Sequence, residues 1–582
     1  MANKMYRPKK EEIKTQKTST NFSVKKNGNS KKKPYDEYSK DDFVAEIEQL
    51  KKRKKYGVVW EEQEEKFDKD TIGKLPVLKE VKTREIETDK KAPVNLLVEG
   101  DNYHSLSVLN YTHEKSVDVI YIDPPYNTGN KDFIYNDSYV DREDAYRHSK
   151  WLSFMAKRLK LAKNILKDAG AIFISIDDNE MYQLKMLMDD IFDERNFIAN
   201  FIWNKKNVVQ NDARFASTNH EYVLCYAKNI DQLGKFQLLP RTEELDARYN
   251  NPDDDPRGSW TSVALQAKSG TEANRYKIKF PNGVVWEPVP GTYPRLTKES
   301  LMKAYKEDRL WFGKSGKNVP RLKKYLSEVK RGVVSNSILL PEDVGSTQSA
   351  KETIKRILGI NVFETPKPVG LIERFIKLVA GEDGIILDFF AGSGTAGHSV
   401  LRLNKTDKGK RQFILCTNDE DNNGTGLGVA TDICYPRIKK VIEGYTDANN
   451  HKKIAGLDGN LKYFKTSFVD ATPTDDNKKK LTDQSTEMLC VRENTFEEVL
   501  NKKDFKIFKN DRKHMGIVFD QSAIADFKKE ARKIKGPIHT YIFSLEDEDF
   551  APELEDMDGR IIVSPIPEVI LRVYRRIFSI KI

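Results

Sequence analysis

Residues 118–126 read Asp-Val-Ile-Tyr-Ile-Asp-Pro-Pro-Tyr, an apolar run that ends abruptly in two prolines. The run Val119–Ile122 predicts a short buried strand, because β-branched and aromatic side chains suit a covered, pleated surface. Pro124 ends that strand, since proline has no N–H to donate to a strand ladder. Asp123 is therefore expected at the carboxyl end of a strand, where open α/β sheets place their ligand sites.

The tetrapeptide Asp123-Pro124-Pro125-Tyr126 suits recognition of an exocyclic amine on a nucleic-acid base. The carboxylate and a backbone carbonyl can accept hydrogen bonds from the two N–H groups of the amine. This arrangement leaves the nitrogen lone pair free as a nucleophile. The prolines stiffen the turn, and the tyrosine offers a ring on which a base taken out of a duplex can stack. The alternative interpretation is a strand followed by an ordinary proline turn, and a second motif argues against it.

That second motif, Leu-Asp-Phe-Phe-Ala-Gly-Ser-Gly-Thr-Ala-Gly-His-Ser-Val, occupies residues 387–400. Gly392, Gly394 and Gly397 form a G-x-G-x-x-G turn between a predicted strand and a predicted helix. Such a turn fits a dinucleotide, S-adenosylmethionine or merely a tight connection. Asp388 favours S-adenosylmethionine, because a carboxylate attracts the ammonium of that ligand and repels a pyrophosphate.

Strands and helices alternate around both motifs, which predicts an α/β fold built on a Rossmann-like sheet. The alternation breaks between residues 205 and 350, where glycine, proline, arginine and aromatic residues predict an inserted domain with hairpins. The predicted organisation is a disordered basic tail at 1–40, a helical and connector region at 41–92, a sheet domain in two parts at 93–204 and 351–466, the inserted domain at 205–350, and a small C-terminal α/β domain at 483–582.

Positive charge is concentrated in the N-terminal tail. The chain of 582 residues has a formal net charge of +10, and residues 1–40 hold twelve Lys or Arg against four Asp or Glu. The remaining residues are nearly balanced, so a DNA-binding surface on the folded body has to be a local patch. The composition of the tail predicts disorder.

The cysteines argue against one class of methyl transfer. None forms a Cys-x-x-Cys pair or has zinc-finger spacing, so we expect reduced thiols and no metal site. No Pro-Cys dipeptide is present, which argues against cytosine-C5 methylation and its cysteine nucleophile. The four cysteines are Cys225, Cys416, Cys434 and Cys490.

No apolar run approaches the ~18 residues of a membrane helix, and no secretory signal is visible, so we expect a cytoplasmic protein without membrane contact.

The order of the two motifs resembles that of β-class amino-methyltransferases, most closely the modification (Mod) subunits of type III restriction-modification systems. The segments IFISIDDNE (172–180) and ETPKPVGLIERFI (364–376) also match. The resemblance covers about residues 90–230 and 360–470. It implies a circularly permuted methyltransferase sheet that transfers a methyl group from S-adenosylmethionine to N6 of an adenine flipped out of duplex DNA. The inserted domain would then be the target-recognition domain.

The resemblance also assigns roles by position. Asp123, Pro124, Pro125 and Tyr126 match the site of the target amine. Asp101 matches a position near the cofactor adenine, although a helix N-cap explains it equally well. The family's acidic ribose-binding residue is absent where expected, and we place that contact at Asp419. The remaining positions that match the cofactor site are Thr365, Lys367, Asp388, Phe390, Gly392, Gly394 and Thr395.

Two other functions stay open on the sequence alone. Cytosine-N4 methylation uses the same amine chemistry, although the N4 members of the family more often carry Ser than Asp at position 123. An NAD-dependent oxidoreductase would explain the glycine turn and leave Asp-Pro-Pro-Tyr unexplained. The chain has no G-x-x-x-x-G-K-[ST] loop and no recognisable nuclease carboxylate set. DNA cleavage is therefore expected to need a separate restriction (helicase/nuclease) subunit. The other expected partners are double-stranded DNA and a second copy of this chain. The C-terminal domain would either form the homodimer or dock a partner subunit.

Overall fold

The computed structural model describes residues 73–578 apart from short gaps, together with Ser39, Lys40, Trp60 and Glu65. The helix predicted to begin near Asp41 and nearly all of the basic tail lie outside the described residues. The chain divides into two units, Met1–Val59 and Trp60–Ile582, and every named helix and strand belongs to the second. The gaps are 90–91, 131, 136–137, 209–214, 331, 361, 422–424, 473, 546–547 and 558.

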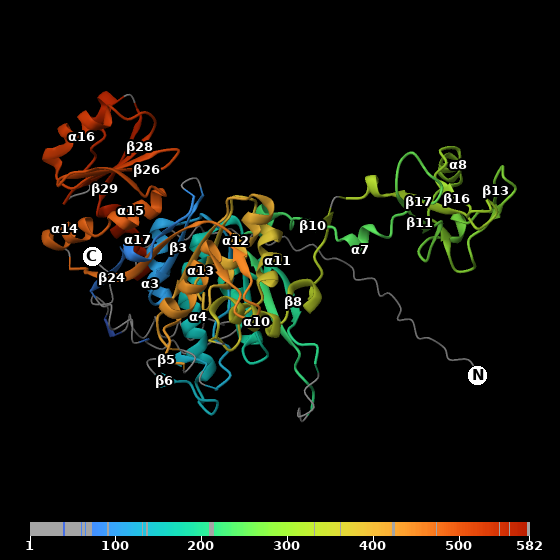
Figure 1. Cartoon of the computed structure of the whole chain (residues 1–582), viewed down its shortest axis with the longest axis horizontal. Helices are drawn as coiled ribbons and strands as arrows, with labels where there is room; N and C mark the ends of the chain where they lie inside the picture. Colours follow the sequence, from blue (N-terminus) through green and yellow to red (C-terminus); the bar gives the residue numbers. More distant parts are fainter. Residues whose placement is uncertain are drawn as a thin grey trace. The chain divides into compact units, whose positions relative to one another are not determined.

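An 11-stranded mixed sheet forms the centre of the second unit (Figure 1). Its strand order is β1-β24-β3-β21-β20-β4-β7-β9-β8-β19, with β2 also paired to β24. The neighbours from β24 to β7 are all parallel. The strand that precedes the glycine motif thus lies beside the strand that precedes Asp-Pro-Pro-Tyr, and the predicted fold class is confirmed. The parallel strands are β24 (Asn460–Asp470), β3 (Val94–Glu99), β21 (Gln412–Thr417), β20 (Ile385–Asp388), β4 (Val117–Ile122) and β7 (Leu166–Ile176).

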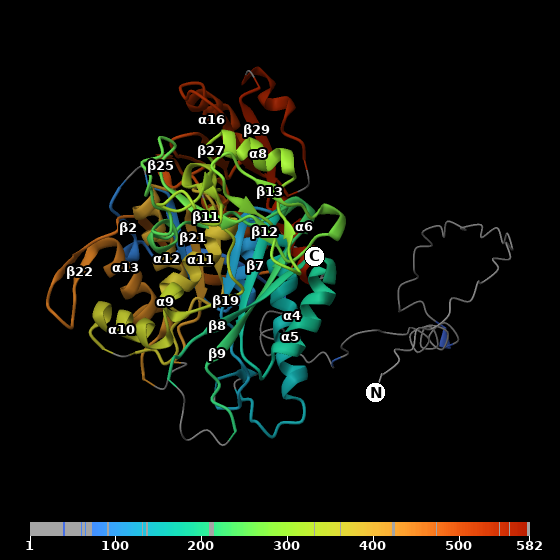
Figure 2. The same ribbon diagram turned by 90° about the vertical axis from the view of Figure 1, so that its right-hand side faces the viewer.

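Helices cover both faces of this sheet. Figure 2 shows α4 and α5 on one side of the strands and α11 and α12 on the other. The rings of Phe173 on β7 and Phe375 on α11 stack with centroids 4.6 Å apart. Burial of an aromatic side chain of this size contributes about 1.5–3 kcal/mol, so such contacts fix the helices on the sheet. The covering helices are α3 (Asn102–Thr112), α4 (Arg147–Ile165), α5 (Met181–Phe192), α11 (Val369–Val379), α12 (Thr395–Asp407) and α13 (Tyr435–Glu443).

Pairing within the sheet sets the ends of two segments. Helix α4 ends at Ile165, because Leu166 already pairs with β4 and the ammonium of Lys167 lies 2.8 Å from the Asp118 carboxylate. The charged connector predicted before Pro93 contains β1 (Lys74–Glu80), which pairs antiparallel with β24. Four consecutive buried side chains in the middle of β1 explain why it joins the sheet.

The predicted inserted domain is wider than the segment that leaves the sheet. The strands β9 (His220–Ala227) and β19 (Ile338–Leu339) lie within residues 205–350 and still belong to the central sheet with β8 (Phe197–Asn204). Most of β9 is buried, which its apolar run favours. The part outside the sheet runs from β10 (Leu239–Pro240) to β18 (Gly332–Val333), and these two strands pair with each other. We call residues 239–333 the inserted segment.

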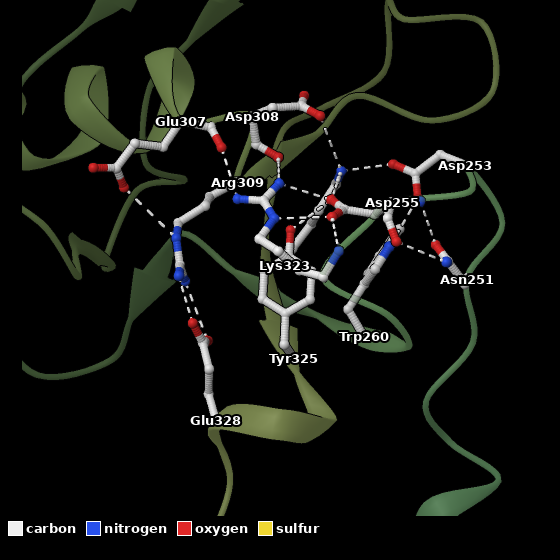
Figure 3. Close-up of polar contacts among 11 residues, drawn as sticks. Asn251, Asp253, Asp255, Trp260, Glu307, Asp308, Arg309, Lys323, Tyr325 and Glu328 are labelled. Atoms are coloured by element: carbon white, nitrogen blue, oxygen red, sulfur yellow. Dashed lines mark hydrogen bonds and ion pairs between the residues drawn. The ribbon is translucent and has the colours of Figure 1, made fainter.

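The inserted segment has its own apolar core and a buried ionic cluster. A three-stranded sheet, β11 (Trp260–Ala264), β17 (Arg321–Tyr325) and β16 (Leu310–Trp311), supports both. Lys323 on β17 is only 1% exposed in its side chain, and its ammonium lies 2.6 Å from Asp253 and 2.9 Å from Asp255 (Figure 3). Burial lowers the pKa of Lys323, but the carboxylates outweigh burial and leave it raised, so this lysine stays charged.

Residues 497–578 contain a five-stranded sheet with helices, within the range 483–582 where the sequence predicts a small α/β domain. Its five-stranded sheet packs against α16 (Ile524–Ala531) around a separate apolar core. Tyr574 on α17 (Glu568–Phe578) donates a hydrogen bond to the backbone carbonyl of Pro76 on β1, which ties this domain to the central sheet. The strands are β25 (Glu497–Asn501), β26 (Phe505–Lys509), β27 (His514–Val518), β28 (Ile538–Phe543) and β29 (Ile561–Ile566).

Candidate active site

A cavity of about 820 Å³ opens at the carboxyl ends of the parallel strands β3, β4, β7, β20 and β21. Both sequence motifs line it, although they are far apart along the chain. Gly394 and Asp419 are the predicted site residues that do not line it. The predicted residues that do are Asp101, Asp123, Pro124, Pro125, Tyr126, Thr365, Lys367, Asp388, Phe390, Gly392 and Thr395.

Three contacts hold the Asp-Pro-Pro-Tyr loop in place. The ammonium of Lys367 donates to Oδ2 of Asp123 at 2.6 Å, and the hydroxyl of Tyr126 donates to Oδ1 at 2.8 Å. From helix α4, the indole N–H of Trp151 donates to the carbonyl of Pro125 at 2.7 Å. The first two contacts orient the Asp123 carboxylate on the cavity side of the loop. The third contact holds the turn from helix α4.

Burial raises the pKa of both cavity carboxyls, Asp123 and Asp388. Burial raises the pKa of Asp123, and the nearby Lys367 only partly offsets it. Burial also raises the pKa of Asp388 to about 8, against the stabilising N–H of Phe390, which donates at 3.0 Å. A cationic ligand would reverse the effect at Asp388, because an opposite charge favours the ionised carboxylate.

Glu221 belongs to this site, and the sequence analysis missed it. This buried carboxylate on β9 accepts a hydrogen bond from Lys205 at 2.9 Å, and Lys367 lies 3.5 Å away. The Tyr126 hydroxyl, whose one hydrogen is shared with Asp123, lies 3.1 Å from it. Burial raises the pKa of Glu221, but the two lysines outweigh burial and lower it overall. The contact between Lys205 and Glu221 is an ion pair. The sequence signal that could have identified Glu221 is a single carboxylate at the start of an otherwise apolar strand.

The glycine loop is shaped by residues on either side of it. Gly392 has φ +49°, and a Cβ there would lie 3.0 Å from the ring of Phe363. Gly394 has φ +78° and caps helix α12, so it shapes the loop without lining the cavity. The buried guanidinium of Arg437 on α13 donates to the carbonyl of Ser393 at 3.1 Å and to the hydroxyl of Thr395 at 2.8 Å.

The two carboxylates assigned to the nucleoside end of the cofactor have different environments. Asp101 caps helix α3 by accepting the N–H of Tyr103 at 2.7 Å, and it also lines the cavity beside Arg158, 3.4 Å away. Asp419 accepts the N–H and hydroxyl of Thr431 at 2.8 and 3.1 Å, outside the cavity. Glu420 lines the cavity in its place.

No group of three or more His, Cys, Asp or Glu side chains in the described part of the chain is arranged to hold a metal ion. The four cysteines are buried and free. Among the helices that the structure describes, none combines the length and apolarity needed to cross a bilayer.

Comparison with known proteins places the chain among DNA-modifying enzymes. The chain is 39% identical to the type III restriction-modification enzyme StyLTI Mod subunit of Salmonella typhimurium, over 61% of this chain and 58% of that protein. It is 33% identical to the EcoPI Mod subunit of Escherichia phage P1, over 65% of this chain and 67% of that protein. It is 34% identical to the type II methyltransferase M.KpnI of Klebsiella pneumoniae, over 61% of this chain and 89% of that protein.

A family model described as DNA methylase matches residues 117–422. This range is more than half of the chain, and it contains Asp-Pro-Pro-Tyr, the inserted segment and the glycine loop. The cavity that joins the two motifs lies largely within the same range. The chain belongs to the DNA methylase family.

Proposed function

We propose that this protein transfers a methyl group from S-adenosylmethionine to the N6 amine of an adenine flipped out of duplex DNA. The observation that carries the proposal is that the Asp-Pro-Pro-Tyr loop and the glycine loop line one cavity. An amine acceptor and a candidate site for the methyl donor therefore lie within reach of each other. Membership of the DNA methylase family supports this reaction and argues against an NAD-dependent oxidoreductase.

Residues of the cavity suit each part of S-adenosylmethionine. Asp388 would attract the ammonium of the methionine part, and Lys367 with Thr365 would meet its carboxylate. Phe390 and Asp101 line the cavity where the nucleoside would lie, and we assign the ribose hydroxyls to Glu420 rather than Asp419. When bound, S-adenosylmethionine would supply an electrophilic methyl carbon, with the neutral thioether as the leaving group once its C–S bond breaks.

The Asp-Pro-Pro-Tyr loop would bind the target amine. The carboxylate of Asp123 would accept a hydrogen bond from one N–H group of the amine. This hydrogen bond becomes stronger as the nitrogen becomes positive in the transition state. After transfer, an N–H bond of the methylated amine breaks and the proton passes to a carboxylate oxygen of Asp123. The raised pKa of Asp123 suits this proton acceptor, because burial favours its neutral form. Tyr126 would stack on the flipped base.

The remaining assignments concern partners. The relatives named Mod subunits support a role as the modification subunit of a type III system, in which a separate restriction subunit would be the partner. The inserted segment is our candidate for target recognition, and the C-terminal domain for dimerisation or docking. We place the protein in the cytoplasm, where its DNA substrate would be. Asp at position 123 favours adenine over cytosine as the target.

The test is methylation of plasmid DNA by the purified chain with S-adenosylmethionine, followed by mass spectrometry of the nucleosides. We expect N6-methyladenine, and only when the donor is added. N4-methylcytosine as the sole product would assign the alternative target. No methylated base in DNA from many sources would overturn the proposal.

A further inference from the structure

A buried polar cluster lies behind the Asp-Pro-Pro-Tyr loop, outside the cavity lining. Asn127, the residue after the motif, is fully buried and has φ +58°, in the left-handed region. Its side-chain N–H groups donate to Oε1 of Glu180 at 2.6 Å and to the backbone carbonyl of Arg147 at 3.2 Å. Together with His148, these residues form what we call the loop clamp.

Glu180 is the centre of the loop clamp. It lies in the segment IFISIDDNE, directly before helix α5, and is fully buried. Its Oε1 lies 2.6 Å from Nδ1 of His148, while Nε of Arg147 donates to Nε2 of the same imidazole at 3.2 Å. Because Nε2 accepts a hydrogen bond from Arg147, the imidazole hydrogen is on Nδ1 and points to Glu180. The carboxyl group therefore joins helix α4 to the catalytic loop.

The catalytic loop is held on both sides of Tyr126. Trp151, one turn along α4 from His148, donates to the carbonyl of Pro125, the residue before the tyrosine. Asn127, the residue after it, is held by Glu180. Burial of a carboxyl costs stability, and an apolar side chain would fill the same space at less cost. The hydrogen bond from Asn127 offsets part of that cost and gives the carboxyl a use that an apolar side chain would not have.

We propose that Glu180 is a positioning residue of the active site, which acts through Asn127 to fix the backbone that presents Asp123 and Tyr126. The inference rests on the proposed methyl transfer, since it concerns the same loop. A displacement of about 1 Å in a reacting group can lower a rate about 100-fold. Loss of the loop clamp should therefore lower kcat much more than it changes the binding of S-adenosylmethionine, whose candidate contacts lie on other residues.

The protonation state of Glu180 provides a second signature. Burial raises its pKa to about 8, Asn127 and Arg147 oppose the rise, and Asp177 adds to it. His148 also faces the carboxyl, and burial and Arg147 lower the pKa of its imidazole. The carboxyl is thus neutral at pH 7 and ionises near pH 8. Glu180→Gln keeps a neutral acceptor for Asn127 at every pH, whereas Glu180→Ala removes it.

The experiment compares kcat, the KM for DNA and the Kd for S-adenosylmethionine in wild type, Glu180→Gln, Glu180→Ala and Asn127→Gly. Glycine at position 127 removes the amide and tolerates the positive φ. Asp190→Ala, an exposed change on the same helix α5, is the matched control. We expect Glu180→Ala and Asn127→Gly to lower kcat about 10- to 100-fold with Kd changed less than threefold. Glu180→Gln should stay within about threefold of wild type.

Two further readouts separate positioning from a general loss of structure. The double variant Glu180→Ala/Asn127→Gly should lose no more activity than either single variant, because the two residues act through one contact. Wild type should lose thermal stability as pH rises from about 4.5 to about 8, where Glu180 is ionised in the unfolded chain and neutral in the folded one, and Glu180→Gln should lose less. The inference is overturned by a kcat for Glu180→Ala near that of wild type, by losses that multiply in the double variant, or by identical pH profiles of thermal stability in wild type and Glu180→Gln. Inactive wild type and inactive Asp190→Ala would instead overturn the proposed function.

Discussion

The ammonium of Lys367 lies 2.6 Å from a carboxylate oxygen of Asp123, although 244 positions separate the two residues in the chain. This ion pair joins the segment before helix α11 to the end of strand β4. It brings a residue assigned to the methyl donor into contact with a residue assigned to the target amine. Donor binding and base binding are therefore expected to influence each other through Lys367.

Replacement of Asp123 should affect chemistry more than binding. In Asp123→Ala we expect kcat to fall by about 10²–10³-fold or more, as when one charge-stabilising group is removed from a dry site. Tyr126→Ala should weaken flipped-base binding and turnover together, by about 1–3 kcal/mol of lost stacking. Single-turnover methylation, with DNA binding followed separately, measures both effects. Near-normal turnover in Asp123→Ala would contradict the proposed mechanism.

Lys367 should set the acid limb of the pH–rate profile. Burial raises the pKa of Asp123 and Lys367 opposes that rise, so loss of the lysine charge raises the pKa further. Activity needs the carboxylate form, and it should fall at a higher pH in Lys367→Met than in wild type. Lys367→Arg keeps the positive charge and is the control. The measurement is kcat against pH at saturating donor, and an unmoved acid limb in Lys367→Met would refute this role.

Binding of S-adenosylmethionine should release protons near neutral pH. The pKa of Asp388 is raised to about 8 without ligand, so the carboxyl is mostly protonated at pH 7. The ligand's ammonium would favour the ionised form, and up to about one proton should leave on binding. Calorimetry at pH 7 in buffers of different ionisation enthalpy counts these protons. Asp388→Asn should bind more weakly and release none, and proton release that persists in this variant would assign the effect to another group.

The buried cluster around Lys323 should stabilise the inserted segment without affecting the cofactor site. Lys323→Met leaves the buried carboxylate of Asp255 with fewer cations, and removal of one partner of a buried pair costs about 3–5 kcal/mol. We expect limited proteolysis to cut within residues 239–333 while the Kd for S-adenosylmethionine stays unchanged. Lys324→Met, an exposed change on the same strand, is the control. Equal protease resistance in the two variants would contradict this assignment.

Exchange of the inserted segment should change the DNA sequence that is methylated. A chimera that carries residues 239–333 of a relative keeps the central sheet, including β9 and β19, and thus the whole cavity lining. We expect it to methylate the relative's target. A broader exchange over 205–350 would also replace Glu221 and should lose activity unless the relative supplies an equivalent carboxylate. A folded, active 239–333 chimera with its original target would place recognition elsewhere.

Much of the chemistry was predictable because each motif is local. Asp-Pro-Pro-Tyr directly follows a β-branched strand, and the glycines directly precede a helix, so both were expected at strand ends. The α/β class and the family are confirmed. The roles of the individual site residues stay predictions, and the structure supports them by gathering all but Gly394 and Asp419 around one cavity.

Tertiary structure decided what depends on contacts between distant segments. The strand order placed β20 beside β4, and the return of β9 to the central sheet brought Glu221 to Tyr126. Neither follows from the local sequence pattern, because an apolar strand has the same pattern whichever strand it pairs with. The role of a single carboxylate in such a strand becomes visible only when the structure places a hydrogen-bond donor beside it. The sequence by itself determined which side chains are candidates for the proposed methyl transfer. Only the packing of the sheet decided which buried charges hold them in place, because burial makes the position of each partner energetically important.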